Sequence, residues 1–327
     1  MTDPTDPTGP ADATDPVLDA VVRERRHLLN LAYRLLGSLA EAEDAVQETY
    51  ARWYAMSREQ QEAIESPGAW LTRVASRVCL DVLGSARARR ERYVGEWIPE
   101  PVPGGTEWLA GVAAPRAAGP GAGGDAADPA ERVTLDESVS MAFLVVLEEM
   151  TPAQRVALIL HDVFAYSFTE VAAVTGRTPA ACRELASAAR RRLRQARPAS
   201  AEAGFYPAAQ AALVRDFKQA WQAHDVKALV ALLDPAAVFT ADGGGLAPAA
   251  LHPIHGAAEI ARFVVEVSQH QRRTATLVER LVNGRPGLLV RIGGETAAVY
   301  AFDVAEDRIT RIWAVRNPLK LRAWAQG

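Results

Sequence analysis

The stretch that most constrains the fold runs from Phe168 to Arg197 and reads FTEVAAVTGRTPAACRELASAARRRLRQAR. Apolar residues at helical spacing predict a short first helix, and Gly176 ends it because glycine readily adopts the left-handed conformation beyond a helix. Thr178 and Pro179 suit the N-cap and the first position of a second helix. We therefore predict two helices that are joined by a tight turn.

The second of these helices has two chemically different sides. Cys182, Ala186, Ala189 and Leu193 form one apolar stripe, while seven arginines and a single acid, Glu184, occur between residues 177 and 197. This arrangement is typical of a helix–turn–helix with a major-groove recognition helix, and a solvated basic helix is the alternative. The candidates for base contacts are Arg183, Glu184 and Ser187, and those for phosphate contacts are Arg177, Arg190, Arg191 and Arg194.

The chain is long enough for two or three domains, since it has 327 residues of which 49% are hydrophobic. Neither a membrane span nor a signal sequence is predicted, so we expect a cytoplasmic location. Two cysteines, Cys79 and Cys182, indicate neither a disulfide framework nor a metal cluster. We expect no cofactor and no metal.

The first 95 residues divide into a tail and a helical domain. Residues 1–16 are acidic and rich in proline, which predicts a disordered tail. Residues 17–95 have helical periodicity throughout, with an acidic stripe early and a basic surface late. Either surface could instead be an ordinary solvated helix face. The acidic stripe is Glu41, Asp44 and Glu48, and the basic side chains include Arg73, Arg77, Arg87, Arg89 and Arg90.

A linker is predicted over residues 96–133, before a second helical domain at 134–198. The linker opens with Trp97-Ile98-Pro99-Glu100-Pro101, in which two prolines favour a stiff, extended conformation. A docking segment and a random linker tryptophan are both consistent with this pattern.

The last part, residues 205–327, combines helices with a series of strands. Helical patterns at 208–234 and 257–268 precede strand-like runs at 275–282, 287–292, 296–304 and 308–315. Turn residues such as Asn283-Gly284 separate the runs, which predicts an antiparallel meander in an α+β domain.

In this arrangement the chain resembles an extracytoplasmic-function sigma factor of the sigma-70 family with a SnoaL-like (NTF2-like) C-terminal domain. The resemblance implies two all-α domains, namely region 2 and region 4 with its helix–turn–helix, followed by a cone-shaped α+β domain. The segment EAEDAVQETYARWY is similar to the core-polymerase-binding helix, which implies this role for Glu41, Asp44, Gln47 and Glu48. The segment SPGAWLTRVASRVCLDVLGSARARRERYVG resembles the promoter-melting part, so Arg73, Arg77 and the arginines at 87–92 are expected to contact DNA. A pocket near Trp70 is expected to receive an unstacked base.

Three short motifs resemble those of the subgroup with the fused domain. They are the linker motif at 97–101, the glycine turn Asp242-Gly243-Gly244-Gly245 and the motif Asn317-Pro318-Leu319-Lys320-Leu321. Leu246 replaces the usual lysine after the glycines, and Gly84 stands where many relatives have arginine. The resemblance implies an intramolecular regulatory contact through Trp97, Pro99, Pro101, Asp242, Asn317, Pro318 and Leu321.

The favoured function is therefore a non-enzymatic sigma factor that binds core RNA polymerase and promoter DNA, regulated in cis by its last domain. One alternative is a helix–turn–helix regulator whose SnoaL-like domain senses or turns over a small molecule, and another is a simple repressor. Candidate acid–base residues for turnover are Asp242, His224, His252 and His255.

Overall fold

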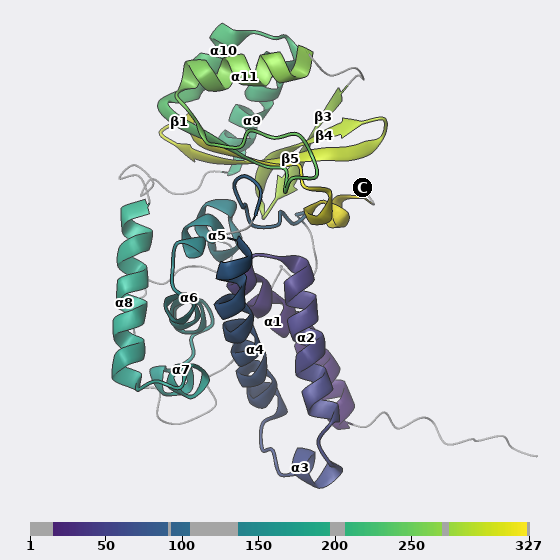
Figure 1. Ribbon diagram of the computed structural model, residues 1–327, viewed down its shortest axis with the longest axis vertical. Coiled ribbons are helices and arrows are strands. Elements are labelled where there is room, and N and C mark those ends of the chain that lie inside the picture. The colour runs from purple at the N-terminus through teal and green to yellow at the C-terminus, as the bar shows by residue number, and fades with distance from the viewer. Residues whose placement is uncertain (1–15, 91–92, 105–136, 197–206, 270–274, 326–327) are drawn as a thin grey trace, which may run out of the picture.

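The structure is a computed structural model that describes residues 16–90, 93–104, 137–196, 207–269 and 275–325 (Figure 1). The predicted tail and most of the predicted linker lie outside these residues. Helices occupy one half of the molecule, and a sheet with its own helices occupies the other.

The N-terminal helices are α1 (Pro16–Leu36), α2 (Leu39–Tyr54), α3 (Arg58–Glu62) and α4 (Pro67–Arg90). Gly37 adopts a φ of 68° between α1 and α2, and the Ser38 side chain accepts a hydrogen bond from the Glu41 amide as the N-cap of α2. The short α3 has no counterpart among the predicted helices. Its sequence, REQQE, is too short and too polar to have a helical apolar period.

The second group of helices contains the predicted helix–turn–helix. It comprises η2 (Glu137–Val139), α5 (Met141–Glu148), α6 (Pro152–Leu158), the π-helix η3 (Ile159–Val163), α7 (Phe168–Thr175) and α8 (Pro179–Ala196). Gly176 ends α7 with a φ of 66°, and Thr178 Oγ1 accepts a hydrogen bond from the Ala181 amide at the start of α8. The predicted local chemistry therefore produces the predicted turn.

The two helical groups share one hydrophobic core. Helix α4 contacts both α6 and α7, and α8 packs against the other side of these helices (Figure 1). Arg155 of α6 is buried at the junction and donates from Nη1 to the Leu35 carbonyl oxygen of α1 at 3.0 Å. The sequence predicts two helical domains joined by a linker but not that they pack together, because sequence periodicity identifies an apolar face but not its partner.

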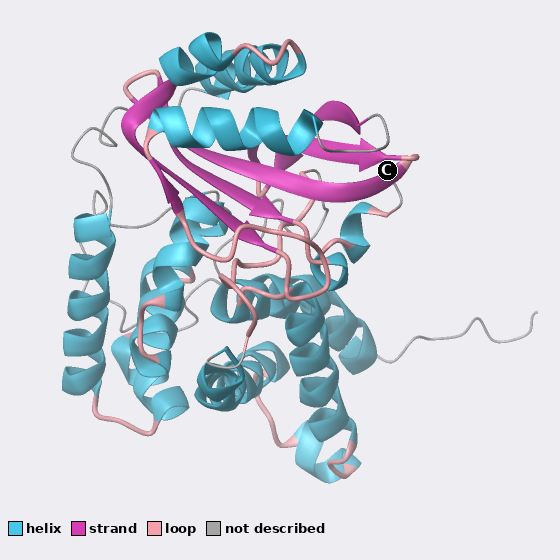
Figure 2. Cartoon of the chain, turned by 45° about the horizontal axis from the view of Figure 1, so that its top comes forward, coloured by secondary structure: helices cyan, strands magenta, loops and turns pink. Residues whose placement is uncertain are grey.

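The C-terminal part has the α+β architecture that the sequence predicts. Helices α9 (Pro207–Gln222), α10 (Val226–Leu232) and α11 (Ala257–Gln269) lie over one face of a six-stranded sheet (Figure 2). The sheet order is β2-β1-β6-β5-β4-β3, and β1 runs parallel to β6 while the other neighbours are antiparallel. The strands are β1 (Leu233–Asp242), β2 (Ile254–His255), β3 (Ala275–Val282), β4 (Arg285–Ile292), β5 (Glu295–Ala305) and β6 (Arg308–Val315), and the short helices η5 (Pro318–Lys320) and η6 (Arg322–Trp324) follow.

Both faces of this sheet are buried. Side chains such as Tyr300 and Ala314 contribute to the core beneath the helices. Their strand neighbours, including Val299 and Val315, face a second cluster with Ile98 of the linker and Met141 of α5. Because successive residues of a strand point to opposite faces, the sheet joins its own helical layer to the linker and the second helical group.

Candidate functional site

The acidic stripe lies on an exposed face of α2. Asp44, Gln47 and Glu48 are exposed, and Glu41 is half-buried. Glu48 forms an i,i+4 ion pair with Arg52 at 2.8 Å. Ala42, Val46 and Trp53 lie in the core, so the exposed Asp44, Gln47 and Glu48 occupy the side of the helix away from it.

The predicted DNA-binding side chains of α4 divide into three groups. Arg73 and Arg77 are exposed, and Arg73 borders a pocket of about 330 Å³ between α4 and α7. Trp70 is half-buried, with its ring 5.3 Å from the Trp53 ring in an edge-on contact. The side chains of Arg87, Arg89 and Arg90 lie outside the described residues.

Most candidates for DNA contact on the helix–turn–helix are exposed. The Arg183 guanidinium lies 5.3 Å from the centre of the Phe168 ring, a cation–π contact that orients it at the start of α8. The other exposed candidates are Arg177, Glu184, Ser187, Arg191 and Arg194.

Arg190 differs from its prediction as a phosphate contact. Its Nε and Nη2 donate to Oδ2 and Oδ1 of Asp162 at 2.7 and 3.0 Å. The Asp162 side chain is fully buried, so removing Arg190 would leave an uncompensated carboxylate in the core. Arg190 therefore attaches α8 to η3, and the sequence does not indicate this because its partner lies 28 residues away.

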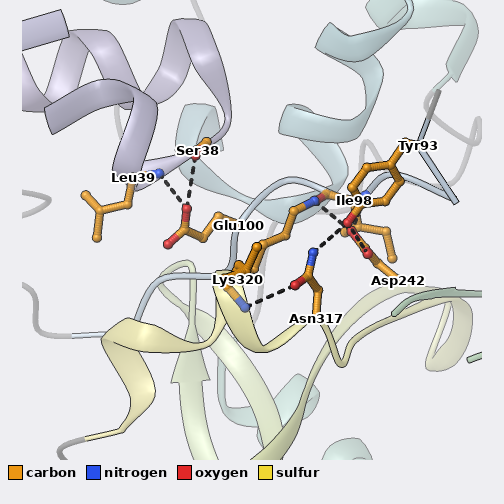
Figure 3. Close-up of polar contacts among 9 residues, drawn as sticks. Ser38, Leu39, Tyr93, Ile98, Glu100, Asp242, Asn317 and Lys320 are labelled. Carbon is orange, nitrogen blue, oxygen red and sulfur yellow. Dashed lines mark hydrogen bonds and ion pairs between the residues drawn. The ribbon is translucent and has the colours of Figure 1, made fainter. Parts of the chain in front are cut away.

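The segment 93–102, which contains the start of the predicted linker, contacts the buried carboxylate of Asp242 (Figure 3). Asp242 accepts hydrogen bonds from Tyr93 Oη at 2.6 Å and from the Ile98 amide at 3.0 Å. Burial, followed by the bond to Asp242, raises the pKa of Tyr93, so its hydroxyl stays a donor. Asn317 Nδ2 donates to the same hydroxyl at 2.7 Å. We call Tyr93, Ile98, Asp242, Asn317 and Lys320 the linker clasp.

Lys320 completes the linker clasp from η5. Its Nζ lies 2.7 Å from Asp242 Oδ2, and it donates to the Ile98 carbonyl oxygen at 2.5 Å. The same ammonium lies 4.1 Å from the centre of the Trp97 ring. Trp97 is only half-buried, whereas Ile98 is 1% exposed, so Ile98 is the buried anchor of this segment. A buried ammonium with a carboxylate, a carbonyl and an aromatic face is well compensated.

The glycine turn is shaped to fit this contact. Gly244 has a φ of 59°, and a Cβ there would lie 2.3 Å from Asn317 Nδ2 and 2.8 Å from Tyr93 Oη. Any side chain would displace both clasp residues. The glycine thus permits close approach of the turn, which is a backbone role distinct from anion binding.

The opposite side of the linker is attached to α1 and α2. Glu100 Oε2 accepts hydrogen bonds from the Leu39 amide at 2.8 Å and from Ser38 Oγ at 3.2 Å, at the N-terminus of α2. The backbone of Glu100 bonds to Gly37 and to Tyr33 Oη. Burial raises the pKa of Glu100, while these donors oppose the increase.

Asn283 connects three segments at the tip of the β3–β4 hairpin. Its Nδ2 donates to Tyr33 Oη and to the Val139 carbonyl oxygen, both at 2.8 Å. Its Oδ1 accepts from the Val102 amide at 3.1 Å. One buried amide thereby joins α1, the linker and the second helical group. The sequence indicates only a turn at this position.

The remaining predicted clasp residues have different environments. Pro99 and Pro101 are buried, and the Pro101 carbonyl oxygen accepts a hydrogen bond from Trp324 Nε1 at 2.8 Å. Leu321 packs in the cluster with Ile98, whereas Pro318 is exposed at the first position of η5. Tyr93, Glu100, Asn283, Lys320 and Trp324 were not among the predicted contact residues.

The residues considered for turnover do not form a catalytic group. His224, His252 and His255 are exposed, and Asp242 belongs to the linker clasp. The apolar pocket beneath α11 is lined by none of these four residues. Within the described ranges, no cluster of His, Cys, Asp and Glu is arranged to hold a metal ion, and no helix is long and apolar enough to cross a membrane.

Comparisons with known proteins agree with this architecture. Residues 20–90 match the family model for sigma-70 region 2, and residues 140–193 match that for sigma-70 region 4. The chain is 38% identical over 305 residues to the ECF RNA polymerase sigma factor SigJ of Mycobacterium tuberculosis, covering 90% of each chain. It is 32% identical over 309 residues to the probable ECF sigma factor SigI of the same species, covering 94% of this chain and 95% of the relative.

The crystal structure of M. tuberculosis SigJ superimposes on the chain with a TM-score of 0.67 and 32% identity. The match covers 94% of this chain and 98% of the crystallised one, so it includes both helical groups and the C-terminal sheet. The chain belongs to the extracytoplasmic-function group of the sigma-70 family of RNA polymerase sigma factors.

Proposed function

We propose that the protein binds core RNA polymerase, directs it to specific promoters, and is regulated in cis by its SnoaL-like domain. In this assignment residues 17–95 bind polymerase and melt the promoter, residues 134–198 read the upstream element, and residues 205–327 regulate. The exposed carboxylates of α2 are the contact for a basic surface of the polymerase. Their position opposite a packed apolar face supports this role.

Promoter contact is assigned to two helices. On α4, Arg73 and Arg77 face solvent near the start of the helix. On α8, Arg183 is held for base contact, and the exposed arginines beyond it suit phosphates. Turnover by the SnoaL-like domain is not part of the proposal, since its exposed histidines lie away from the apolar pocket.

Regulation follows from the spacing of these two helices. In this assignment α4 contacts the minus-ten element of the promoter and α8 contacts the upstream, minus-thirty-five element. These elements are about 25 base pairs apart, or about 85 Å along B-DNA. Helices α4 and α8 are separated only by the layer of α6 and α7, which is two interaxial spacings or about 20 Å. One molecule in this arrangement cannot reach both elements, so we infer that it is a closed state that must open on polymerase.

The linker clasp is the single observation that carries this regulatory role. It attaches the SnoaL-like domain to the segment that must extend when α4 and α8 separate. Asp242 and Lys320 both belong to the domain and stay paired, but if the linker leaves, Asp242 loses its two donors, Tyr93 Oη and the Ile98 amide. Lys320 likewise loses the Ile98 carbonyl oxygen and the Trp97 ring. The domain therefore favours the closed state for as long as the clasp holds.

In vitro transcription with purified core polymerase tests the proposal, comparing the full chain, residues 1–204, and the full chain carrying Asp44→Arg and Glu48→Arg. We expect promoter-specific transcripts from the full chain, altered activity after removal of the domain, and none from the charge-reversed protein. The charge-reversed protein should remain folded, because both positions are exposed. Retention of polymerase binding by that variant, once circular dichroism shows it folded, would contradict the assignment of α2.

A further inference from the structure

The π-helix η3 lies directly before the helix–turn–helix. The Phe164 amide donates to the Ile159 carbonyl oxygen at 3.1 Å, which is the i→i+5 bond that defines this type of helix. A π turn contains more residues than an α turn, so the neighbours His161 and Asp162 diverge less around the axis than they would in an α-helix. Single turns of this kind are frequent at functional sites. Here both side chains contact the helix–turn–helix.

The imidazole of His161 stacks on the ring of Phe168, the first residue of α7. The two ring centres are 3.9 Å apart, the planes differ by 23°, and both residues are buried. His161 Nδ1 donates to the Tyr166 carbonyl oxygen at 2.8 Å, and the Tyr166 amide donates to the Leu160 carbonyl oxygen at 2.9 Å. These two bonds attach the turn before α7 to the π-helix, so that the stacked rings have a fixed orientation.

The Phe168 ring in turn contacts Arg183, the candidate for base readout on α8. The guanidinium carbon lies 5.3 Å from the ring centre, within the range of a cation–π contact. A guanidinium uses its flat face for such a contact, and its in-plane N–H donors can then form a bidentate bond with the edge of a guanine. An arginine that is already oriented also loses less rotamer freedom when it binds a base.

Asp162 holds the same helix at a second point. Its carboxylate accepts two hydrogen bonds from Arg190, which lies seven residues after Arg183. Seven residues make two helical turns, or about 10 Å, so both arginines lie on the same side of α8. Contacts at two points along one side fix the rotation of a helix as well as its position. The π-helix therefore determines how α8 presents its side chains.

We infer that His161 is a positioning residue for promoter readout, which acts through the ring of Phe168 to orient Arg183 toward one base pair of the upstream element. The inference rests on the proposed function, in which α8 reads that element. It extends the readout to two buried side chains that contact Arg183 or its support and not the DNA.

Selection from a DNA library tests the inference, using the full chain bound to core polymerase and DNA randomised over both promoter elements. Sequencing of the bound DNA gives the preference at each base pair, and titration of the whole pool gives the overall affinity. Arg183→Ala should reduce the preference at one base pair by about fivefold to 150-fold. This variant identifies the base pair at which the others are compared.

Two variants of His161 separate the aromatic ring from the hydrogen bond. His161→Asn keeps an amide donor for the Tyr166 carbonyl oxygen but removes the ring. It should reduce the preference at the Arg183 base pair by about twofold to fivefold, which is the contribution of an exposed cation–π contact. His161→Phe keeps a ring without the hydrogen bond and should retain the preference. Phe168→Leu, which is apolar but has no ring, should resemble His161→Asn.

A double variant tests the route through Arg183. Arg183→Ala combined with His161→Asn should have the preference of Arg183→Ala alone, because His161 then has no side chain to orient. The overall affinity of His161→Asn for the pool should stay within about twofold of wild type, since phosphate contacts dominate it. His224→Asn is the matched control: His224 is exposed, and its φ of 54° is one that Asn tolerates. This control should leave every preference unchanged.

Circular dichroism and thermal unfolding establish that each variant is folded. Wild-type preference in folded His161→Asn and Phe168→Leu would overturn the inference, and so would a loss of preference in His161→Phe or a further loss in the double variant. These outcomes leave the proposed function intact as long as Arg183→Ala loses preference at one base pair. An Arg183→Ala protein that keeps every preference contradicts instead the proposed role of α8, and the inference falls with it.

Discussion

Replacing Asp242 with Asn should release the linker without unfolding either core. The carboxylate uses Oδ1 for Tyr93 and Oδ2 for both Ile98 and Lys320. An amide has one acceptor oxygen, so at least one of these interactions is lost whichever way the side chain turns. The ammonium of Lys320, with its side chain only 10% exposed, then lacks its counter-charge.

Removing one partner of a buried ion pair costs about 3–5 kcal/mol. This cost is relieved when the linker leaves and water reaches Lys320, so opening of the clasp should increase by up to about 150-fold to several thousand-fold. Hydrogen exchange of the peptide spanning residues 93–103 measures this opening directly. The Ile98 amide, which donates to Asp242, should lose most protection. The double variant Asp242→Asn with Lys320→Met should regain part of the loss, because no unpaired charge remains.

Asp307→Asn is the matched control. This substitution makes the same chemical change at the exposed β5–β6 turn, where Asp307 has a φ of 60° that Asn tolerates well. Exchange of residues 93–103 should not change in this control. If Asp242→Asn leaves that exchange at the level of Asp307→Asn, the carboxylate does not hold the linker and the reasoning fails.

Three other predictions follow from particular side chains. Arg183→Ala should cost about 1–3 kcal/mol of binding free energy at one base pair of the upstream element. Arg191→Ala should weaken binding to all sequences alike and reduce the slope of log K against log salt concentration by about one. Identical profiles of the two variants across promoter variants in a binding assay would contradict these roles. Burial lowers the pKa of His27 to about 4, so the stability that comes from burying its neutral ring is present above pH 6.5 and is lost as the pH falls from 6.5 to about 4. The loss in the free energy of unfolding is at most about 3 kcal/mol. Urea unfolding of wild type and His27→Phe at pH 7 and pH 5 should show a smaller pH effect in the variant. Asn283→Gly preserves the positive φ but leaves the Val102 amide and the Val139 carbonyl without partners, so proteolysis between the helical groups and the sheet should accelerate, and an unchanged rate would argue against the junction.

Local features of the fold could be predicted from the sequence. The bounds of β3 and β6 agree with the runs at 275–282 and 308–315, and Gly176 and Thr178 form the turn that their chemistry indicates. These features depend on neighbours within a few residues, where periodicity and capping preferences operate. The family resemblance, and not local periodicity, indicated that the motifs at 97–101, 242–245 and 317–321 take part in one intramolecular contact.

The contacts between distant segments could not be predicted in this way. Asn283 and Tyr33 lie 250 residues apart, and an Asn-Gly turn gives no sign that its amide will be buried. Arg190 has the same sequence context as Arg191, yet one is paired with Asp162 and the other is exposed. Glu100 is buried against a helix terminus that lies 61 residues earlier in the chain, so its neighbours in sequence do not indicate its burial. Each case depends on which faces meet, and amphipathic patterns leave that open.

The linker and the residues that hold it belong to one polypeptide. Joined in this way, they meet at an effective concentration that is fixed by the chain, typically in the millimolar range for short flexible connections. The closed fraction therefore does not change with the amount of protein in the cell. Twofold more expression yields twofold more open factor, whereas a factor held by a separate inhibitor stays silent until the inhibitor is exhausted. In the proposed regulation, the contact through Asp242 would make the output of this gene proportional to its dosage.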